Sequence, residues 1–373
     1  MPNRGPTPVA NQPATPSKGA PGRQPTPTGT RSGSPGPPGK QPAGQNPGQS
    51  SGQGSGHIGG LKITDEADHL QNPNYPESEY QQTDVPAHSS LFLAVSAAVN
   101  LGIALLECDR GKTSLVNIGI EVVRAAIRFQ TPHVFPDTEA NRTTMTPHVD
   151  EFLRQLRGQF VPILLTNHIG GEARVTRFNW AQAQAGQPAK TMKDYVAAQA
   201  GFIKINKFVF ETLVVACRER QTNGAYDKVY ELQMFLMAIA IAHEVAHLFV
   251  SFRHGSYRPN TPASITFLPM WYNKPSPDGL SIDGESGRRW EADVFGGAIE
   301  HFAEPIPEEL DKHPLKQRQA GDLWLFDAHE NAQLVERAAI RRVFAFDFSP
   351  QALPLRTAGP LLTMSTSIGL DTP

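Results

Sequence analysis

The spacing of apolar residues predicts that most of the chain beyond residue 85 is helical. In several segments apolar residues recur every three or four positions, or form a continuous run of helical length. Ser89 or Ser90 can cap the first predicted helix, and Asp227 can cap the longest one. The predicted helices cover residues 91–107, 115–129, 149–165, a stretch after 205, 228–252, 286–304 (ended by Pro305 and Pro307) and 327–341.

Extended segments are fewer and shorter. Polar and apolar residues alternate over 172–180 after a Gly-Gly turn, and shorter runs at 202–205 and 342–348 also favour strands. Proline and small polar residues predict loops at 109–114, 131–150 and 255–284. Together these elements predict an α+β fold, mainly helical with a small sheet, and we find no internal repeat.

Composition divides the chain into an arm and a body. Residues 1–60 contain no Asp, Glu or aromatic residue and carry a charge of +5, whereas the rest of the chain carries −7. The arm has too little apolar surface for its burial to offset the conformational entropy lost on ordering. We therefore predict that the arm is disordered. We expect a linker over 61–85, a folded domain over 86–350 and an irregular tail over 351–373.

The arm itself gives weak functional signals. PxxP spacings at Pro13/Pro16 and Pro35/Pro38 could bind an SH3-type protein partner, or could be chance spacings in a proline-rich segment. Five scattered positive charges without aromatic residues do not indicate a specific nucleic-acid partner.

Membrane insertion and secretion are not expected. The apolar run 91–106 is interrupted by Ser96 and Asn100, the run 234–250 contains two His and a Glu, and both favour core helices. No signal-peptide pattern follows the first residue. The two cysteines, Cys108 and Cys217, form no disulfide framework, which suits a reducing compartment, so we expect a cytoplasmic protein.

The chemistry-bearing motif lies within the longest predicted helix, in the run A-I-A-H-E-V-A-H-L-F-V. His243 and His247 are four residues apart, so they project from one helix face and can hold one metal ion. Glu244 lies beside that face, where it can act as a general base on a metal-activated water. Zinc suits such ligands and lowers the pKa of a bound water to about 7. The alternative is a pair of hydrogen-bonded core histidines and a surface glutamate.

This H-E-x-x-H helix resembles the active-site helix of the zincin metallopeptidases. The resemblance covers this helix and, more loosely, residues 200–305, but not the first 190 residues. It implies one zinc ion, a third protein ligand, Glu244 as catalytic base and a peptide or protein substrate.

Two zincin patterns predict different third ligands. The metzincin continuation fails, because Val250 and Arg253 occupy the positions of its glycine and histidine. The gluzincin pattern takes a Glu from a later helix, for which we favour Glu291 and keep Glu285 as the alternative. An Asp four residues after the ligand is missing in both cases, which leaves the subfamily unassigned.

The resemblance also suggests where substrate would bind. Such peptidases usually bind substrate along a sheet edge, a role for which the strand at 202–205 is the candidate. An oxyanion donor could come from His254 or Tyr257, and Arg258 and His301 are further candidates after the motif.

Two other functions remain open at this stage. One is a scaffold, structural or regulatory protein that keeps a zincin-like fold without catalysis, although a structural site would not need Glu244. The other is hydrolysis of a non-peptide amide, as in deformylases, which use a Cys ligand that neither Cys108 nor Cys217 convincingly supplies.

Overall fold

The computed structural model describes residues 58–66, 82–129, 140–169, 171–181, 192–254, 261–267, 284–301, 322–329 and 331–363. All of these described ranges belong to one compact unit. The predicted disordered arm lies outside the described residues except for 58–60. These three residues pack against the body, because Ile58 is buried and the Gly59 N–H donates to the Arg157 carbonyl at 2.8 Å.

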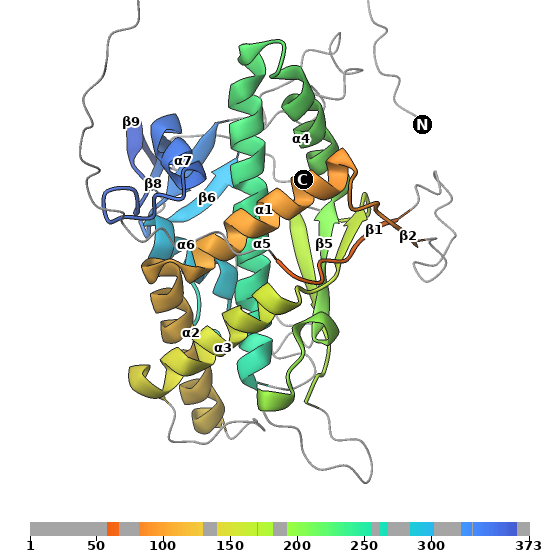
Figure 1. Cartoon of the computed structure of the whole chain (residues 1–373). Helices are drawn as coiled ribbons and strands as arrows, with labels where there is room; N and C mark the ends of the chain where they lie inside the picture. The colour runs from red at the N-terminus through yellow and green to blue at the C-terminus, as the bar shows by residue number, and fades with distance from the viewer. Residues whose placement is uncertain are drawn as a thin grey trace, which may run out of the picture. The chain divides into compact units, whose positions relative to one another are not determined.

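One long helix, α5 (Asp227–His254), forms the centre of this unit (Figure 1). It is apolar on nearly all sides from Leu232 onward, which is the pattern of a helix surrounded by other elements. Figure 1 shows α1 crossing it, and a Cβ added to Gly102 of α1 would lie 2.7 Å from the Ala238 carbonyl oxygen. The other helices are α1 (Ser90–Glu107), α2 (Asp109–Phe129), α3 (Arg142–Gly158), α4 (Lys207–Glu219), α6 (Ser286–Phe295) and α7 (Arg337–Phe344).

Both α1 and α5 are long and apolar enough to cross a membrane, judged by length and composition alone. In α5, 89% of the apolar window is buried inside the protein, against 44% in α1. The apolar surface of α5 is therefore used in the core, while part of α1 stays exposed.

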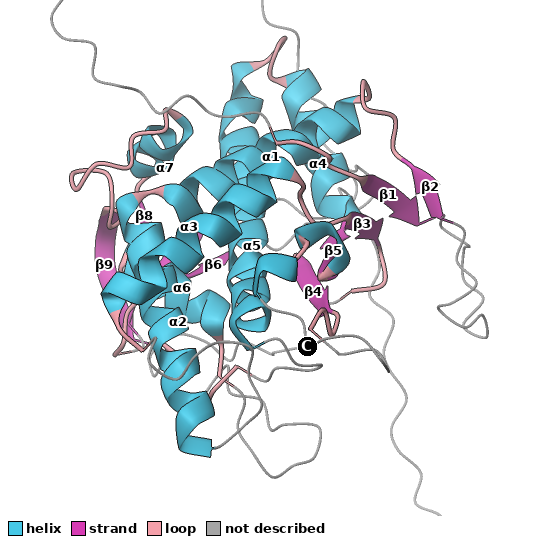
Figure 2. Cartoon of the chain, turned by 60° about the horizontal axis from the view of Figure 1, so that its bottom comes forward, coloured by secondary structure: helices cyan, strands magenta, loops and turns pink. Residues whose placement is uncertain are grey.

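Two small sheets lie on opposite sides of the helical layer (Figure 2). The first has the order β2-β1-β3-β5-β4, in which β1, β3 and β5 are parallel and the two edge strands are antiparallel to their neighbours. The second is an antiparallel meander, β6-β7-β8-β9. The strands are β1 (Ile63–Glu66), β2 (Gln82–Asp84), β3 (Ile163–Thr166), β4 (Ala173–Arg177), β5 (Gly201–Asn206), β6 (Ala298–His301), β7 (Leu323–Phe326), β8 (Asn331–Val335) and β9 (Thr357–Thr363).

The α+β class and several elements predicted from the sequence are confirmed. Helices α1, α4 and α5 and strands β4 and β5 form where the residue pattern places them. Ser89 caps α1, since its side chain accepts the Phe92 N–H.

Several predicted loops and helix ends were wrong. Residues 109–114 form the first turns of α2, and the predicted loop 131–150 contains the start of α3, capped by Asn141. Helix α3 ends at Gly158, so residues 163–166 are free to form β3. Helix α6 ends at Gly296, which adopts the left-handed conformation that glycine allows (φ 91°), and β6 follows.

The ends of the domain were also predicted incorrectly. Residues 61–85, assigned to a linker, supply β1 and β2, and the tail assigned as irregular supplies β9. The predicted helix 327–341 is β8 followed by the start of α7, and the predicted strand 342–348 contains the end of α7.

Candidate metal centre

Two imidazoles and one carboxylate converge between α5 and the start of α6. His243 and His247 lie one turn apart on α5, with ring centroids separated by 5.1 Å. Glu285, the N-cap residue of α6, places Oε2 at 2.9 Å from His247 Nε2 and 3.4 Å from His243 Nε2. One potential ligand atom from each residue lies within 4.8 Å of the others. We call His243, His247 and Glu285 the histidine–carboxylate cluster.

The sequence G-E-S-G explains how Glu285 reaches this position. The N–H groups of Gly284 and Glu285 donate to the carbonyls of Thr261 and Ile265, both at 2.8 Å. A Cβ at Gly284 would lie 2.1 Å from the Pro262 carbonyl oxygen, and one at Gly287 would lie 2.2 Å from the His243 ring. Glycine at these two positions therefore lets the backbone of the α6 N-terminus approach α5 closely.

Each histidine has a second partner on its other ring nitrogen. His243 Nδ1 lies 2.6 Å from Glu291 Oε1, and His247 Nδ1 lies 2.9 Å from Ser286 Oγ. Because a carboxylate only accepts, His243 must donate Nδ1–H to Glu291. These contacts orient both Nε2 atoms toward Glu285, which is how metal-binding histidines are usually held.

Glu291, favoured from the sequence as the third ligand, therefore lies on the other side of the His243 ring. Its second oxygen accepts from Arg288 Nη1 at 2.9 Å and from the Ile299 N–H at 3.0 Å. Burial alone would raise the pKa of this carboxyl, but the Arg288 charge and the His243 hydrogen bond outweigh it and lower the pKa. Glu285, kept as the alternative, is the carboxylate that the structure brings to both Nε2 atoms.

The two carboxylates stabilise positive charge on the histidines. Burial would lower the pKa of His243, but hydrogen bonds and charges from Glu285 and Glu291 reverse the effect and raise it to about 10. Burial would raise the pKa of Glu285, whereas the charges and hydrogen bonds of His247 and His243 lower it below its usual range. Within the described residues, buried Glu285 Oε2 has no hydrogen-bond partner besides these two imidazoles. An oxygen of this kind facing two imidazole nitrogens fits a divalent metal ion.

Glu244 points from α5 toward the first sheet. It is 8% exposed, and its Oε2 accepts the Val175 N–H of β4 at 2.8 Å. Further along the same helix, Trp180 Nε1 donates to the Ser251 carbonyl at 3.0 Å. Helix α5 and strand β4 therefore run side by side, with Glu244 between the cluster's helix and the sheet.

The edge strand next to this site is β4, not the strand predicted for that role. Residues 202–205 belong to β5, which lies between β3 and β4. The outer edge of the sheet on this side is formed by β4, since β5 is its partner on the inner side.

The other predicted site residues do not join the cluster. His254 ends α5, two turns and about 10 Å along the axis from His247. His301 on β6 pairs with Glu172, with 3.3 Å between Nδ1 and Oε1. Tyr257 and Arg258 lie outside the described residues. Arg253, at the metzincin ligand position, is fully buried and contacts Met192 Sδ at 2.9 Å.

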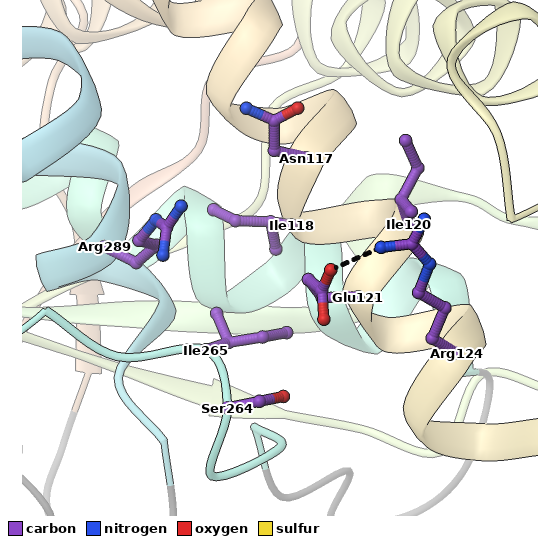
Figure 3. Close-up of a pocket in the computed structure, with 8 residues that line it drawn as sticks. All are labelled: Asn117, Ile118, Ile120, Glu121, Arg124, Ser264, Ile265 and Arg289. Atoms are coloured by element: carbon purple, nitrogen blue, oxygen red, sulfur yellow. Dashed lines mark hydrogen bonds and ion pairs between the residues drawn. The ribbon is translucent and has the colours of Figure 1, made fainter. Parts of the chain in front are cut away.

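A polar pocket of about 310 Å³ lies on the α2 side of α6 (Figure 3). Glu121 and Arg124 form an ion pair at 2.9 Å, drawn as the dashed line, and Arg289 of α6 lies on the opposite side of the pocket. Ile265 lines the pocket and also accepts the Glu285 N–H, so one loop borders both features. None of the lining residues belongs to the cluster, so this pocket is separate from the histidines.

Sequence reasoning missed Ser286 and Arg288. Ser286 directly follows a candidate ligand, and a hydroxyl there could have been considered as a histidine partner. Arg288 gives no comparable signal, because its role depends on Glu291 and the Ile299 carbonyl, which it contacts at 2.8 Å. Searches against protein-family models, curated proteins and solved structures find no match to this chain.

Proposed function

We propose that this protein is a zinc-dependent peptidase with a zincin-like domain, in which His243, His247 and Glu285 hold the metal. One observation carries the proposal: the Nε2 atoms of both histidines face the same buried, otherwise unpaired oxygen of Glu285. Two core histidines with an ordinary structural role would not need to face one buried carboxylate oxygen next to another titratable residue, Glu244.

Zinc is the metal that best suits two imidazoles and one carboxylate. Three protein ligands are typical of catalytic zinc sites, whereas structural sites are usually closed by four. Bound zinc would lower the pKa of a coordinated water to about 7 and polarise a substrate carbonyl.

Glu244 is the proposed general base. It would take the proton of the attacking water and return it to the leaving amine. The Val175 N–H donates to Oε2 at 2.8 Å and fixes the orientation of the carboxylate. Glu291 and Ser286 would act as positioning residues, because each contacts the Nδ1 atom of a histidine.

The outer edge of β4 is the proposed site for an extended peptide. The Phe178 N–H donates to Ala200 and the Glu172 carbonyl accepts from Asn206, so even-numbered residues face β5. Odd-numbered residues of β4 consequently direct their backbone groups to the outer edge, as Val175 does toward Glu244. An extended chain added there would pass beside the proposed base.

Metal analysis of purified protein tests the site. We expect about one zinc ion per chain in the wild type and in Glu244→Gln, and little in His247→Gln and Glu285→Gln. With a quenched fluorescent peptide library, Glu244→Gln should lose at least about 10²-fold in rate while retaining zinc.

Each alternative gives a different result. A wild type that binds no zinc, even after zinc is added, would contradict the metal site. If neither the zinc-loaded wild type nor Glu244→Gln cleaved any peptide, the scaffold function would be favoured. Equal and measurable cleavage by both proteins would exclude Glu244 as the base.

A further inference from the structure

A groove of about 360 Å³ lies where the first half of α1 meets the end of α4 and the start of α5, and its last α5 residue, Met234, is about two and a half turns before His243. This volume is within the range of small-molecule sites, and the exposed lining is mostly apolar. The lining residues are Ser90, Leu93, Ala94, Ala97, Val214, Cys217, Arg218, Gln221, Tyr230 and Met234.

The shape of the groove follows from one stripe of α1. Leu93, Ala94 and Ala97 lie on the same helix face, and the two alanines leave a hollow that α4 and α5 do not fill. Leu93 is a large apolar side chain that is 58% exposed, while Met234 beneath is only 4% exposed. The groove thus combines an apolar floor with an apolar wall that remains in contact with solvent.

The rim of the groove is positively charged. Arg218 is exposed, and within the described part of the chain its guanidinium has no ion-pair or hydrogen-bond partner. Arg220 lies nearby, with its guanidinium 3.8 Å from the centre of the Tyr230 ring. The N-terminus of α1 at Ser90 contributes a partial positive charge. No lining residue is acidic.

We propose that this groove binds an anionic amphiphile: a single alkyl chain with a carboxylate or similar head group. The alkyl chain would lie along Leu93, Ala97 and Met234, and the head group would pair with Arg218. This inference does not depend on the metal centre, because it rests on other residues at another end of α5.

The groove contains its own reporter. Cys217 lines it and is partly exposed, whereas Cys108 is buried and burial raises the pKa of its thiol. A neutral maleimide should therefore modify Cys217 and leave Cys108 largely unmodified. A ligand in the groove would cover Cys217 and slow the reaction.

The test measures the rate of Cys217 modification in the full chain by mass spectrometry, with decanoate below its micelle concentration as the probe. We expect saturable protection that strengthens with chain length from octanoate to dodecanoate, by up to about fourfold per methylene. Decanol and decyltrimethylammonium share the alkyl chain without the negative charge and should protect less.

Variants separate the two halves of the site. Arg218→Gln should weaken decanoate binding by about two- to fivefold, the usual contribution of an exposed ion pair, without changing the effect of decanol. Arg154→Gln, which removes another exposed charge, paired with Glu151 on α3, is the control and should behave like wild type. Ala97→Phe, at an exposed position, should fill the groove and abolish protection.

Four results would overturn the proposal. Cys217 that does not react without ligand would mean that another part of the chain covers the groove. Equal protection by decanoate and decanol, or no protection by either, would exclude recognition of an anionic amphiphile. Binding to phosphatidylglycerol-containing vesicles without decanoate protection would identify a membrane surface instead.

Discussion

Replacing Glu291 with Gln tests whether this residue positions His243 or binds the metal itself. Glu291 accepts three hydrogen bonds, from His243 Nδ1, Arg288 Nη1 and the Ile299 N–H. A glutamine has one acceptor oxygen, and its NH₂ group would face at least one of these donors. The replacement therefore disturbs the orientation of His243 but leaves His247 and Glu285 in place.

The expected effect is a partial loss of zinc affinity. Partners of metal-binding histidines are typically worth about 10- to 100-fold in affinity, or about 1.4–2.7 kcal/mol. The dissociation constant can be measured by competition with a chromophoric chelator, with unfolding followed in parallel. Glu285→Gln should have a much larger effect, because it removes a ligand.

Glu300→Gln is the matched control. Glu300 pairs with Nη2 of Arg288 and is 28% exposed, whereas Glu291 contacts Nη1 of Arg288 and the His243 ring. It should bind zinc like the wild type. If Glu291→Gln abolished zinc binding while Glu285→Gln preserved it, the assignment of ligand and positioning residue would have to be reversed.

Three further predictions address the same centre. Gly287→Ala should displace α6 and greatly weaken zinc binding, because the added Cβ would lie 2.2 Å from the His243 ring. In the same chelator assay, Gly158→Ala is the control and should leave zinc binding unchanged, because a Cβ at Gly158 meets no atom within 4 Å. Ser286→Ala should weaken zinc binding by no more than about tenfold, less than Glu291→Gln, because only a neutral hydrogen bond to His247 is lost; an effect larger than that of Glu291→Gln would contradict this ranking. In metal-free protein, the raised pKa of His243 means that its protonated ring stabilises the folded state fully below about pH 6.5, and that this contribution is lost as the pH rises toward 10. The free energy of unfolding, measured in urea, should therefore fall over that range by at most about 1.4 kcal/mol per pH unit. His243→Gln should show a smaller decline, and an equal decline in both proteins would exclude His243 as the cause.

The sequence predicted the part of the centre that depends on one helix. His243, Glu244 and His247 are related by helical spacing alone, so their relative placement follows once α5 is helical. The choice between Glu285 and Glu291 depends on how α6 approaches the His243 ring, which is a tertiary property. Gly287 packs against the His243 ring, which brings the carboxylate of Glu285 near Nε2 and the carboxylate of Glu291, farther along α6, near Nδ1.

The missed elements have similar causes. The run from Ser286 to Pro305 reads as one helix, but Gly296 adopts a positive φ and ends it, so β6 follows. Gly296 and Gly297 were themselves a signal for a helix C-terminus. Strands β1, β3 and β6 are short, and strand pairing across distant parts of the chain is not visible in local spacing.

Two contacts tie α5 to β4 and to the turn that follows it, and they limit changes in chain length at this edge. The Val175 N–H of β4 donates to Glu244, and the Trp180 indole of the following turn donates to the Ser251 carbonyl. Successive residues of β4 point in opposite directions, so one residue inserted or deleted after Val175 within the strand would reverse the direction of the residues that lead to Trp180 and disfavour keeping both contacts. Related chains that keep both contacts should therefore vary in sequence at 176–179 while keeping the number of residues there constant.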